Sequence, residues 1–173
     1  MPFELNRLDE SRWAAHRERR TAICELILDA GSGYYQSLGL SRPEIIEHIE
    51  TEILRAQGEL GSIFTLEDEN GLSGLVASVA ENNLESSRKM SLARALKKMS
   101  SEGRRATLAR MREHNAAIAP HFGGGRYLSR IAVAPAHRGQ GIGSLLMQRV
   151  LAALEGETIS LHVDRDNKAA IAL

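Results

Sequence analysis

Three glycines alternate with other residues in the segment R-G-Q-G-I-G-S, which runs from Arg138 to Ser144. Glycine lets the backbone approach a ligand closely, and an apolar pattern with helical spacing begins directly after these glycines. A helix that starts there directs its unpaired N–H groups and the positive end of its dipole at the turn. This spacing predicts an anion-binding site, and a phosphate is the favoured anion.

The spacing of the glycines separates this segment from two common nucleotide-binding motifs. A dinucleotide-binding fingerprint, G-x-G-x-x-G, needs a third glycine where Ser144 follows Gly139 and Gly141. A P-loop ends in G-K-[ST], and no lysine follows any of these glycines. The segment therefore matches neither of these nucleotide-binding motifs.

The residues around the glycines predict a βαβ unit. Leu128, Ile131 and Val133 indicate a strand before the turn, and apolar residues at helical spacing follow from 142 to 154. Residues 159–163 alternate as a second strand. A right-handed crossover is expected for such a unit.

The pattern Arg138-x-x-Gly141-x-Gly143, preceded by V-x-P, resembles motif A of the GNAT N-acetyltransferase superfamily. The segment L-H-V-D-R-D-N-K-A-A-I-A-L resembles the next strand and motif B of that family. The resemblance implies an α/β (α+β) fold with a mixed central sheet flanked by helices. It also implies that acetyl-CoA is the co-substrate, that the loop holds its pyrophosphate, and that Asn167 contacts its pantetheine arm. The cofactor-binding residues expected from the resemblance are Ile131, Ala132, Val133, Arg138, Gly139, Gln140, Gly141, Ile142, Gly143, Ser144 and Asn167.

The chemistry implied by the resemblance is acetyl transfer from a thioester to an amine. A lysine-like amine with a pKa of ~10.4 is mostly protonated at neutral pH, so a base must take its proton. Many relatives place a glutamate in the strand before motif A, and that position falls near Tyr127. The nearest substitutes in sequence are Glu81 and His121, so the candidate catalytic residues are Glu81, His121 and Tyr127. A backbone N–H at Val133 or a neighbour is expected to stabilise the oxyanion.

A loop between the first two predicted helices carries Tyr34 and Tyr35, the candidate substrate-binding residues. Paired tyrosines can stack on or hydrogen-bond an acceptor, and they can equally pack against the sheet. Relatives often take the general acid from a tyrosine in the helix that Asn167 begins. The sequence ends at Leu173, about one turn into that helix, and we expect the last two strands of the family sheet to lie beyond it.

The first eighty residues predict the order β-α-α-β-β. A short strand includes Phe3 and Leu5, and one helix runs from a cap at Asp9 or Ser11 to Ala30. The segment S-R-P-E from Ser41 to Glu44 predicts a capping box, and the helix that follows has Ile45, Ile49 and Ile53 on its buried face. Two strands are expected around 63–65 and 72–79, joined by a turn at 69–71.

A helical insertion at 83–120, broken near Gly103, is expected before the motif A strand. Residues 83–113 contain nine Lys or Arg and three Asp or Glu. Residues 1–82 contain seven Lys or Arg and fifteen Asp or Glu. A solvated basic surface is the favoured interpretation, because this stretch has no aromatic residue for base stacking. A nucleic-acid contact is the alternative. A third use is a lid or homodimer arm that meets the acidic N-terminal half.

Composition favours a single GNAT-like domain over 1–173, since the chain has 173 residues and a 43% hydrophobic fraction. The N-terminus lacks an apolar leader and no segment is long enough for a membrane span, so a cytoplasmic protein is expected. The six histidines are scattered and Cys24 is the only cysteine, so no metal site is predicted. The expected function is an N-acetyltransferase for a primary amine of a small molecule or peptide. The alternative is a CoA-binding regulatory or nucleic-acid-contacting module without efficient catalysis.

Overall fold

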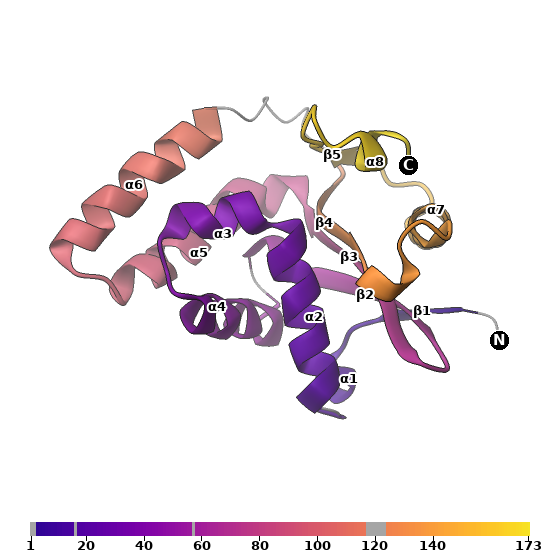
Figure 1. Ribbon diagram of the computed structural model, residues 1–173. Helices are drawn as coiled ribbons and strands as arrows, with labels where there is room; N and C mark the ends of the chain where they lie inside the picture. Colours follow the sequence, from indigo (N-terminus) through magenta and orange to yellow (C-terminus); the bar gives the residue numbers. More distant parts are fainter. Residues whose placement is uncertain (1–2, 16, 57, 117–123) are drawn as a thin grey trace.

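Five strands form one mixed sheet in the order β1-β2-β3-β4-β5 (Figure 1). The computed structural model describes residues 3–15, 17–56, 58–116 and 124–173. The strands are β1 (Glu4–Arg7), β2 (Ser62–Asp68), β3 (Gly71–Ala80), β4 (Arg126–Val133) and β5 (Ile159–Leu161). The pairs from β1 to β4 are antiparallel, and β5 is parallel to β4. The predicted mixed sheet and the βαβ unit are confirmed.

Helices connect the strands in three groups. Between β1 and β2 lie α1 (Glu10–Ala15), α2 (Arg17–Ala30), α3 (Ser32–Leu38), α4 (Arg42–Leu54) and the 3-10 turn η1 (Gly58–Leu60). Between β3 and β4 lie α5 (Glu81–Lys97) and α6 (Ser101–Ala116). The turn η2 (Pro135–His137) and α7 (Ile142–Ala153) join β4 to β5, and α8 (Lys168–Ile171) follows β5. In the described part of the chain, none of these helices has both the length and the apolar character needed to cross a bilayer.

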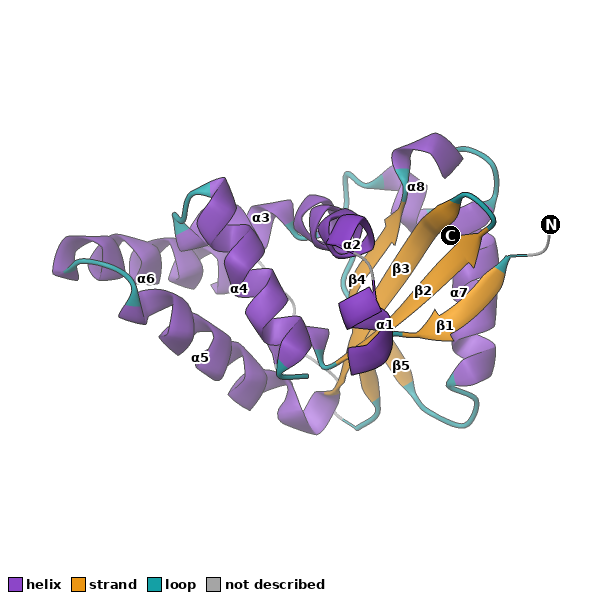
Figure 2. Cartoon of the chain, turned by 90° about the horizontal axis from the view of Figure 1, so that it is seen from below, coloured by secondary structure: helices purple, strands orange, loops and turns teal. Residues whose placement is uncertain are grey.

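The sheet separates two apolar cores. On β3, Leu75 and Ala77 face the core that α1 to α6 cover, whereas Val76 faces the core under α7. This alternation follows from the two-residue period of a strand. Figure 2 shows α1 and α2 on one face of the sheet and α7 on the other. The sheet is therefore buried on both faces, and β4 runs between the two cores.

Local sequence signals predicted most elements, and two expectations are corrected. Tyr34 and Tyr35 lie in the short helix α3 rather than in a loop, since α6 packs on α3 and stabilises it. The helix expected up to Ala30 is described as α1 and α2 on either side of residue 16, which lies outside the described residues. Gly103 lies inside α6, and the break falls at residues 98–100, between α5 and α6.

The insertion docks on the acidic N-terminal half through ion pairs. Lys98 Nζ lies 2.7 Å from a Glu47 oxygen, and Arg94 lies 3.8 Å from Glu52. The favoured expectation, a solvated basic surface, holds for the Lys98 side chain, which is 46% exposed, whereas Arg94 is partly buried against Glu52. These contacts agree with an insertion that meets the acidic half, and its use as a lid or homodimer arm stays a prediction.

Candidate functional site

The turn between β4 and α7 has the open backbone that an anion site needs. Gly139 and Gly141 adopt left-handed φ values of 73° and 77°, which L side chains rarely adopt. The first hydrogen bond of α7 runs from the Leu145 N–H to the Gly141 carbonyl, at 3.1 Å. The N–H groups of residues 142–144 precede that bond and have no acceptor within the helix. A Cβ added at Gly139 or Gly141 would meet no described atom within 4 Å, so the turn borders open space.

One edge of β4 loses its partner strand before the turn. Among the described residues, β5 pairs with β4 over 126–128 and no further. The Ala134 N–H donates to Ser73 on the β3 side, at 2.9 Å. Because successive N–H groups of a strand point to opposite sides, those of Val133 and Ile131 point away from β3. Main-chain donors therefore line the gap where β4 and β5 diverge.

Three predicted cofactor-binding side chains bond to protein groups near this turn. Arg138 donates to the Val133 carbonyl at 3.0 Å and to Asp29 at 2.6 Å. Gln140 donates to the Ala136 carbonyl at 2.8 Å. Asn167 caps α8, because its side-chain oxygen accepts the Ala170 N–H at 3.1 Å. Their roles toward a ligand stay predictions.

A cavity of about 760 Å³ lies between α3, the insertion helices and β4. It brings together Tyr34, Glu81 and Tyr127, three of the residues that the sequence singled out. Tyr35 instead lines a second cavity of about 640 Å³ that borders Arg138. His121 lies outside the described residues. The first cavity is the candidate acceptor site.

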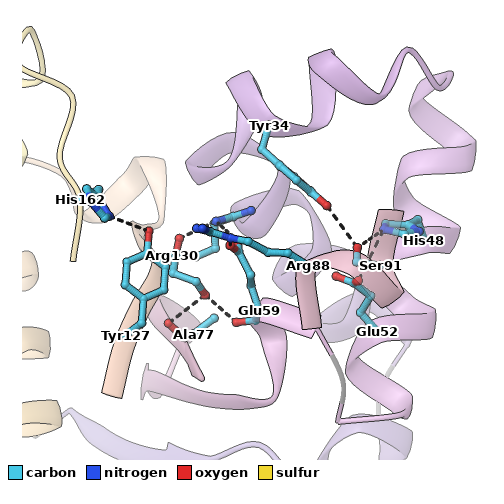
Figure 3. A network of polar contacts seen from close by, with 11 residues as sticks. Tyr34, His48, Glu52, Glu59, Ala77, Arg88, Ser91, Tyr127, Arg130 and His162 are labelled. Carbon is cyan, nitrogen blue, oxygen red and sulfur yellow. Dashed lines mark hydrogen bonds and ion pairs between the residues drawn. The ribbon is translucent and has the colours of Figure 1, made fainter. Parts of the chain in front are cut away.

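A buried carboxylate, Glu59, lines this cavity and is held by two arginines. Figure 3 shows the three side chains. Glu59 accepts from Arg130 at 3.0 Å and from Arg88. Burial alone would raise the pKa of Glu59, but Arg130 and Arg88 outweigh it and hold the pKa below its usual value. The Arg130 guanidinium also lies over the rings of Tyr34 and Tyr35, at 5.4 and 5.5 Å. The ion pair thus fixes the position of both tyrosines.

Tyr127 stands where β4 and β5 still pair, opposite Ser160. Its hydroxyl lies 3.4 Å from His162 Nδ1, and burial raises its pKa. The Ser160 hydroxyl donates to Glu81, which begins α5. Next along β4, Ser129 is an extra residue relative to β3, a β-bulge. Glu81 and Tyr127 therefore both lie near the point where the two strands separate, and both line the cavity.

A second polar cluster lies behind Tyr34. The Tyr34 hydroxyl is 3.2 Å from Ser91 Oγ, and this oxygen lies 3.0 Å from His48 Nε2 (Figure 3). Glu52 lies 3.6 Å from the same histidine nitrogen. Burial raises the pKa of Glu52 to about 7. The pKa of His48 is lowered to about 4 by burial and by the charges of Arg94 and Lys98.

Sequence reasoning missed most of these polar partners. Glu59 and Arg130 are 71 residues apart in the sequence, and Tyr34 and Ser91 are 57 residues apart. Local residue spacing therefore predicts neither contact. One signal was available: Arg130 interrupts an apolar strand between Leu128 and Ile131. A charged residue at such a position is rarely buried without a partner.

The chain matches the sequence model described as "Acetyltransferase (GNAT) family" over residues 5–173. It is similar in structure to an N-acetyltransferase from Staphylococcus aureus Mu50, with 20% identity and a TM-score of 0.63, over 91% of this chain and 84% of the other. An acetyltransferase from Corynebacterium glutamicum, described as related to histone acetyltransferase HPA2, has 17% identity and a TM-score of 0.55, with 97% and 81% covered. The aminoglycoside N-acetyltransferase AAC(6')-Iy in complex with CoA is also similar in structure, with 10% identity and a TM-score of 0.54 over 99% of this chain and 83% of the other. Comparison with curated protein sequences gave no match.

Proposed function

Because the chain belongs to the GNAT acetyltransferase family and is an acyltransferase, we propose that it moves an acetyl group from acetyl-CoA to a primary amine. The observation that carries the proposal is the divergence of β4 from β5 beside a glycine turn at the start of α7. Donors on the β4 edge and at the N-terminus of α7 stand at the two ends of the same turn. The acceptor is a small-molecule or peptide amine.

The residues of the turn suit the diphosphate of acetyl-CoA. The N–H groups of Ile142, Gly143 and Ser144 offer three donors, and the left-handed Gly139 and Gly141 border open space, while the Leu173 side chain lies against Gly143. Acetyl-CoA supplies the thioester that is attacked. The outward N–H groups of Ile131 and Val133 are assigned to bind its pantetheine arm and to stabilise negative charge on the acyl oxygen.

The cavity beside Tyr127 is assigned to the amine. Glu81 lines it next to the strand junction, where a carboxylate attracts an ammonium group. The raised pKa of Tyr127 keeps its hydroxyl protonated, so that it can donate toward a thiolate leaving group. Glu81 is also the candidate base for the amine proton, and replacing it by Gln tests that role.

Titration calorimetry with CoA tests the glycine turn. Gly141→Val should weaken CoA binding by at least about tenfold, or about 1.4 kcal/mol, because a β-branched residue resists a φ of 77°. Gly156→Val is the matched control. Gly156 has a φ of 86° beyond the other end of α7, so its replacement adds similar strain without touching the turn. Equal CoA affinity in wild type and Gly141→Val would refute the assignment of the turn.

Release of free thiol from acetyl-CoA tests the reaction. The panel of acceptors is kanamycin, spermidine, glycylglycine and Nα-acetyl-lysine, which covers polyamine, peptide and lysine-like amines. Turnover with one of them, together with acetylated product by mass spectrometry, supports the proposal. CoA binding without thiol release from any of them supports the alternative, a CoA-binding regulatory module.

A further inference from the structure

The charged side chains that line the acceptor cavity fall into three separate groups. The cavity is lined by equal numbers of acids and bases, namely Glu59, Glu81, Glu85, Arg88, Lys89 and Arg130. Glu85 and Lys89 form an exposed ion pair of 2.6 Å. The second group is Glu59 with its two arginines. The third is Glu81, which accepts from the Ser160 hydroxyl and has no ion-pair partner among the described residues. The charges of the cavity therefore balance in number but not in position.

The group around Glu59 carries an excess of positive charge. Arg88 and Arg130 hold the pKa of Glu59 below its usual value, so this residue is ionised at neutral pH. Arginine does not lose its proton in proteins, so one carboxylate faces two guanidinium ions. The next buried carboxylate, Glu52, has its own cation nearby, Arg94 at 3.8 Å. An uncompensated buried charge is costly, so this group favours the binding of an anion.

Arg130 supplies the buried part of this charge. Its side chain is 8% exposed, and both of its hydrogen bonds, to Glu59 and to the Ser129 carbonyl, come from one terminal nitrogen, Nη1. Arg130 Nε is buried without a hydrogen-bond partner among the described residues. Gly31, which also lines the cavity, makes room for it, because a Cβ at that position would come within 2.4 Å of Nε.

Arg88 is the more accessible of the two arginines. Its side chain is 27% exposed, and its guanidinium lies 5.5 Å from the centre of the Tyr127 ring, which belongs to another lining residue. Figure 3 shows Arg88 and Arg130 together at Glu59. A guanidinium presents five N–H donors in a planar fork that matches a carboxylate. A ligand carboxylate bound to Arg88 would therefore neutralise the charge that Glu59 leaves unbalanced.

Glu81 and Arg88 face the same short stretch of the sheet. Both belong to α5, where seven residues place their Cα atoms about 10 Å apart on one side of the helix. Glu81 bonds Ser160 on β5, and Arg88 lies over Tyr127 on β4. These two strand residues are direct partners in the sheet. An extended dipeptide spans about 7 Å, so its two charged ends can lie near Glu81 and Arg88 at once.

We infer that the acceptor is a zwitterion, whose amine lies against Glu81 and whose carboxylate, about two residues' length away, binds Arg88 beside Arg130. This inference rests on the proposed function. A dipeptide fits this description, and so does a lysine with a blocked α-amine, because its side-chain amine is separated from its carboxylate by a comparable length. Kanamycin and spermidine bring no carboxylate to Arg88, so both should be poor acceptors.

Glycylglycine and its C-terminal amide test the inference by kinetics, since they share the amine and differ in the charge of the other end. The wild-type kcat/KM should be at least about tenfold higher with the acid than with the amide, because a charge-assisted bidentate contact is lost in the amide. Arg88→Gln should remove most of this preference, whereas Arg88→Lys, which keeps the charge, should retain part of it.

Arg94→Gln is the matched control. Arg94 also lies on α5, is 21% exposed and stands near a buried carboxylate, but it lies outside the lining of the cavity. Its replacement should leave the ratio of acid to amide unchanged. The comparison of acid with amide in the wild-type protein stands even where Arg88→Gln fails to fold.

Saturation-transfer NMR reports acceptor binding without turnover. Glycylglycine should give a stronger signal than its amide with the wild-type protein, and Arg88→Gln should abolish the difference. Equal kcat/KM values or equal NMR signals for acid and amide with the wild-type protein overturn the inference, as does a preference for the acid that survives Arg88→Gln. Failure of the proposed function looks different: the protein then shows no heat with CoA and no thiol release, while NMR still separates the acid from the amide.

Discussion

At the scale of single residues, Glu59 is the side chain on which the cavity depends. Its two arginine partners come from α5 and β4, and it is 8% exposed. A buried ion pair adds little stability compared with apolar packing, but removal of one partner leaves an uncompensated charge. The ion pair therefore serves to fix the geometry of the cavity, with Arg130 held against Tyr34 and Tyr35.

Glu59→Gln should destabilise the protein by about 3 kcal/mol at pH 7, because Arg88 and Arg130 then share no negative charge. The folded-state pKa of Glu59 lies below its usual value. Its ionic contribution is therefore complete above the unfolded-state pKa of about 4.3 and is lost as the pH falls through the lower folded-state pKa. Urea unfolding should show that wild type and Glu59→Gln differ at pH 7 and that the difference shrinks as the pH falls through the lowered folded-state pKa.

The exposed pair of Lys89 and Glu85, at 2.6 Å, is the control. Lys89→Gln should change the free energy of unfolding by less than about 1 kcal/mol, because surface pairs contribute little. A gap between wild type and Glu59→Gln that stayed constant from pH 7 to pH 3 would contradict the ionic role of Glu59.

At the scale of secondary-structure elements, the insertion completes the C-terminal end of α3. The Thr107 hydroxyl donates to the Leu38 carbonyl at 2.8 Å, and Arg110 Nε donates to the Ser37 carbonyl at 3.0 Å. These carbonyls belong to the last turn of the helix, where no intrahelical donor follows. Helix α3 carries Tyr34, so α6 supports the acceptor cavity through α3.

Thr107→Val should cost about 1–2 kcal/mol of unfolding free energy, because the shape is kept while the buried Leu38 carbonyl loses its donor. The substitution should also increase the rate of amide hydrogen exchange more in α3 than in α7. Thr21→Val offers a comparison, since the Thr21 hydroxyl bonds an exposed carbonyl of its own helix. Equal losses of stability in the two variants would argue against the capping role of α6.

The same elements show what a sequence can and cannot predict. The turn from β4 to α7 was predicted because its signals are local: alternating apolar residues, left-handed glycines and an amphipathic helix. Helix α3 was expected to be a loop because Gly31 and Gly33 flank its start, and its support comes from Thr107, far along the chain. The polar contacts of Arg130 and Ser91 are equally distant in sequence, so only the folded chain brings them together.

At the scale of the whole molecule, the chain is neutral but its charges are segregated. The formal net charge is zero, and the basic helices of the insertion lie on the acidic helices of the N-terminal half. Figure 1 shows α5 and α6 beside α3 and α4, away from the centre of the sheet. Opposite charges thus help to orient the insertion. The internal ion pairs reduce the positive field that an outside polyanion would meet.

Nucleic-acid binding should accordingly be weak. Of the nine Lys and Arg residues at 83–113, seven are exposed, but two of these, Lys89 and Lys98, are paired with carboxylates. Fluorescence anisotropy with a labelled single-stranded RNA of about 20 nucleotides should give a Kd near the weak end of non-specific binding, ~100 μM, at physiological salt. Glu47→Gln, which releases Lys98 from its ion pair, should tighten this binding slightly. Submicromolar affinity at 50 mM salt that falls by about a thousandfold at 200 mM would instead identify the insertion as a nucleic-acid surface, because such a slope reports the release of many counterions.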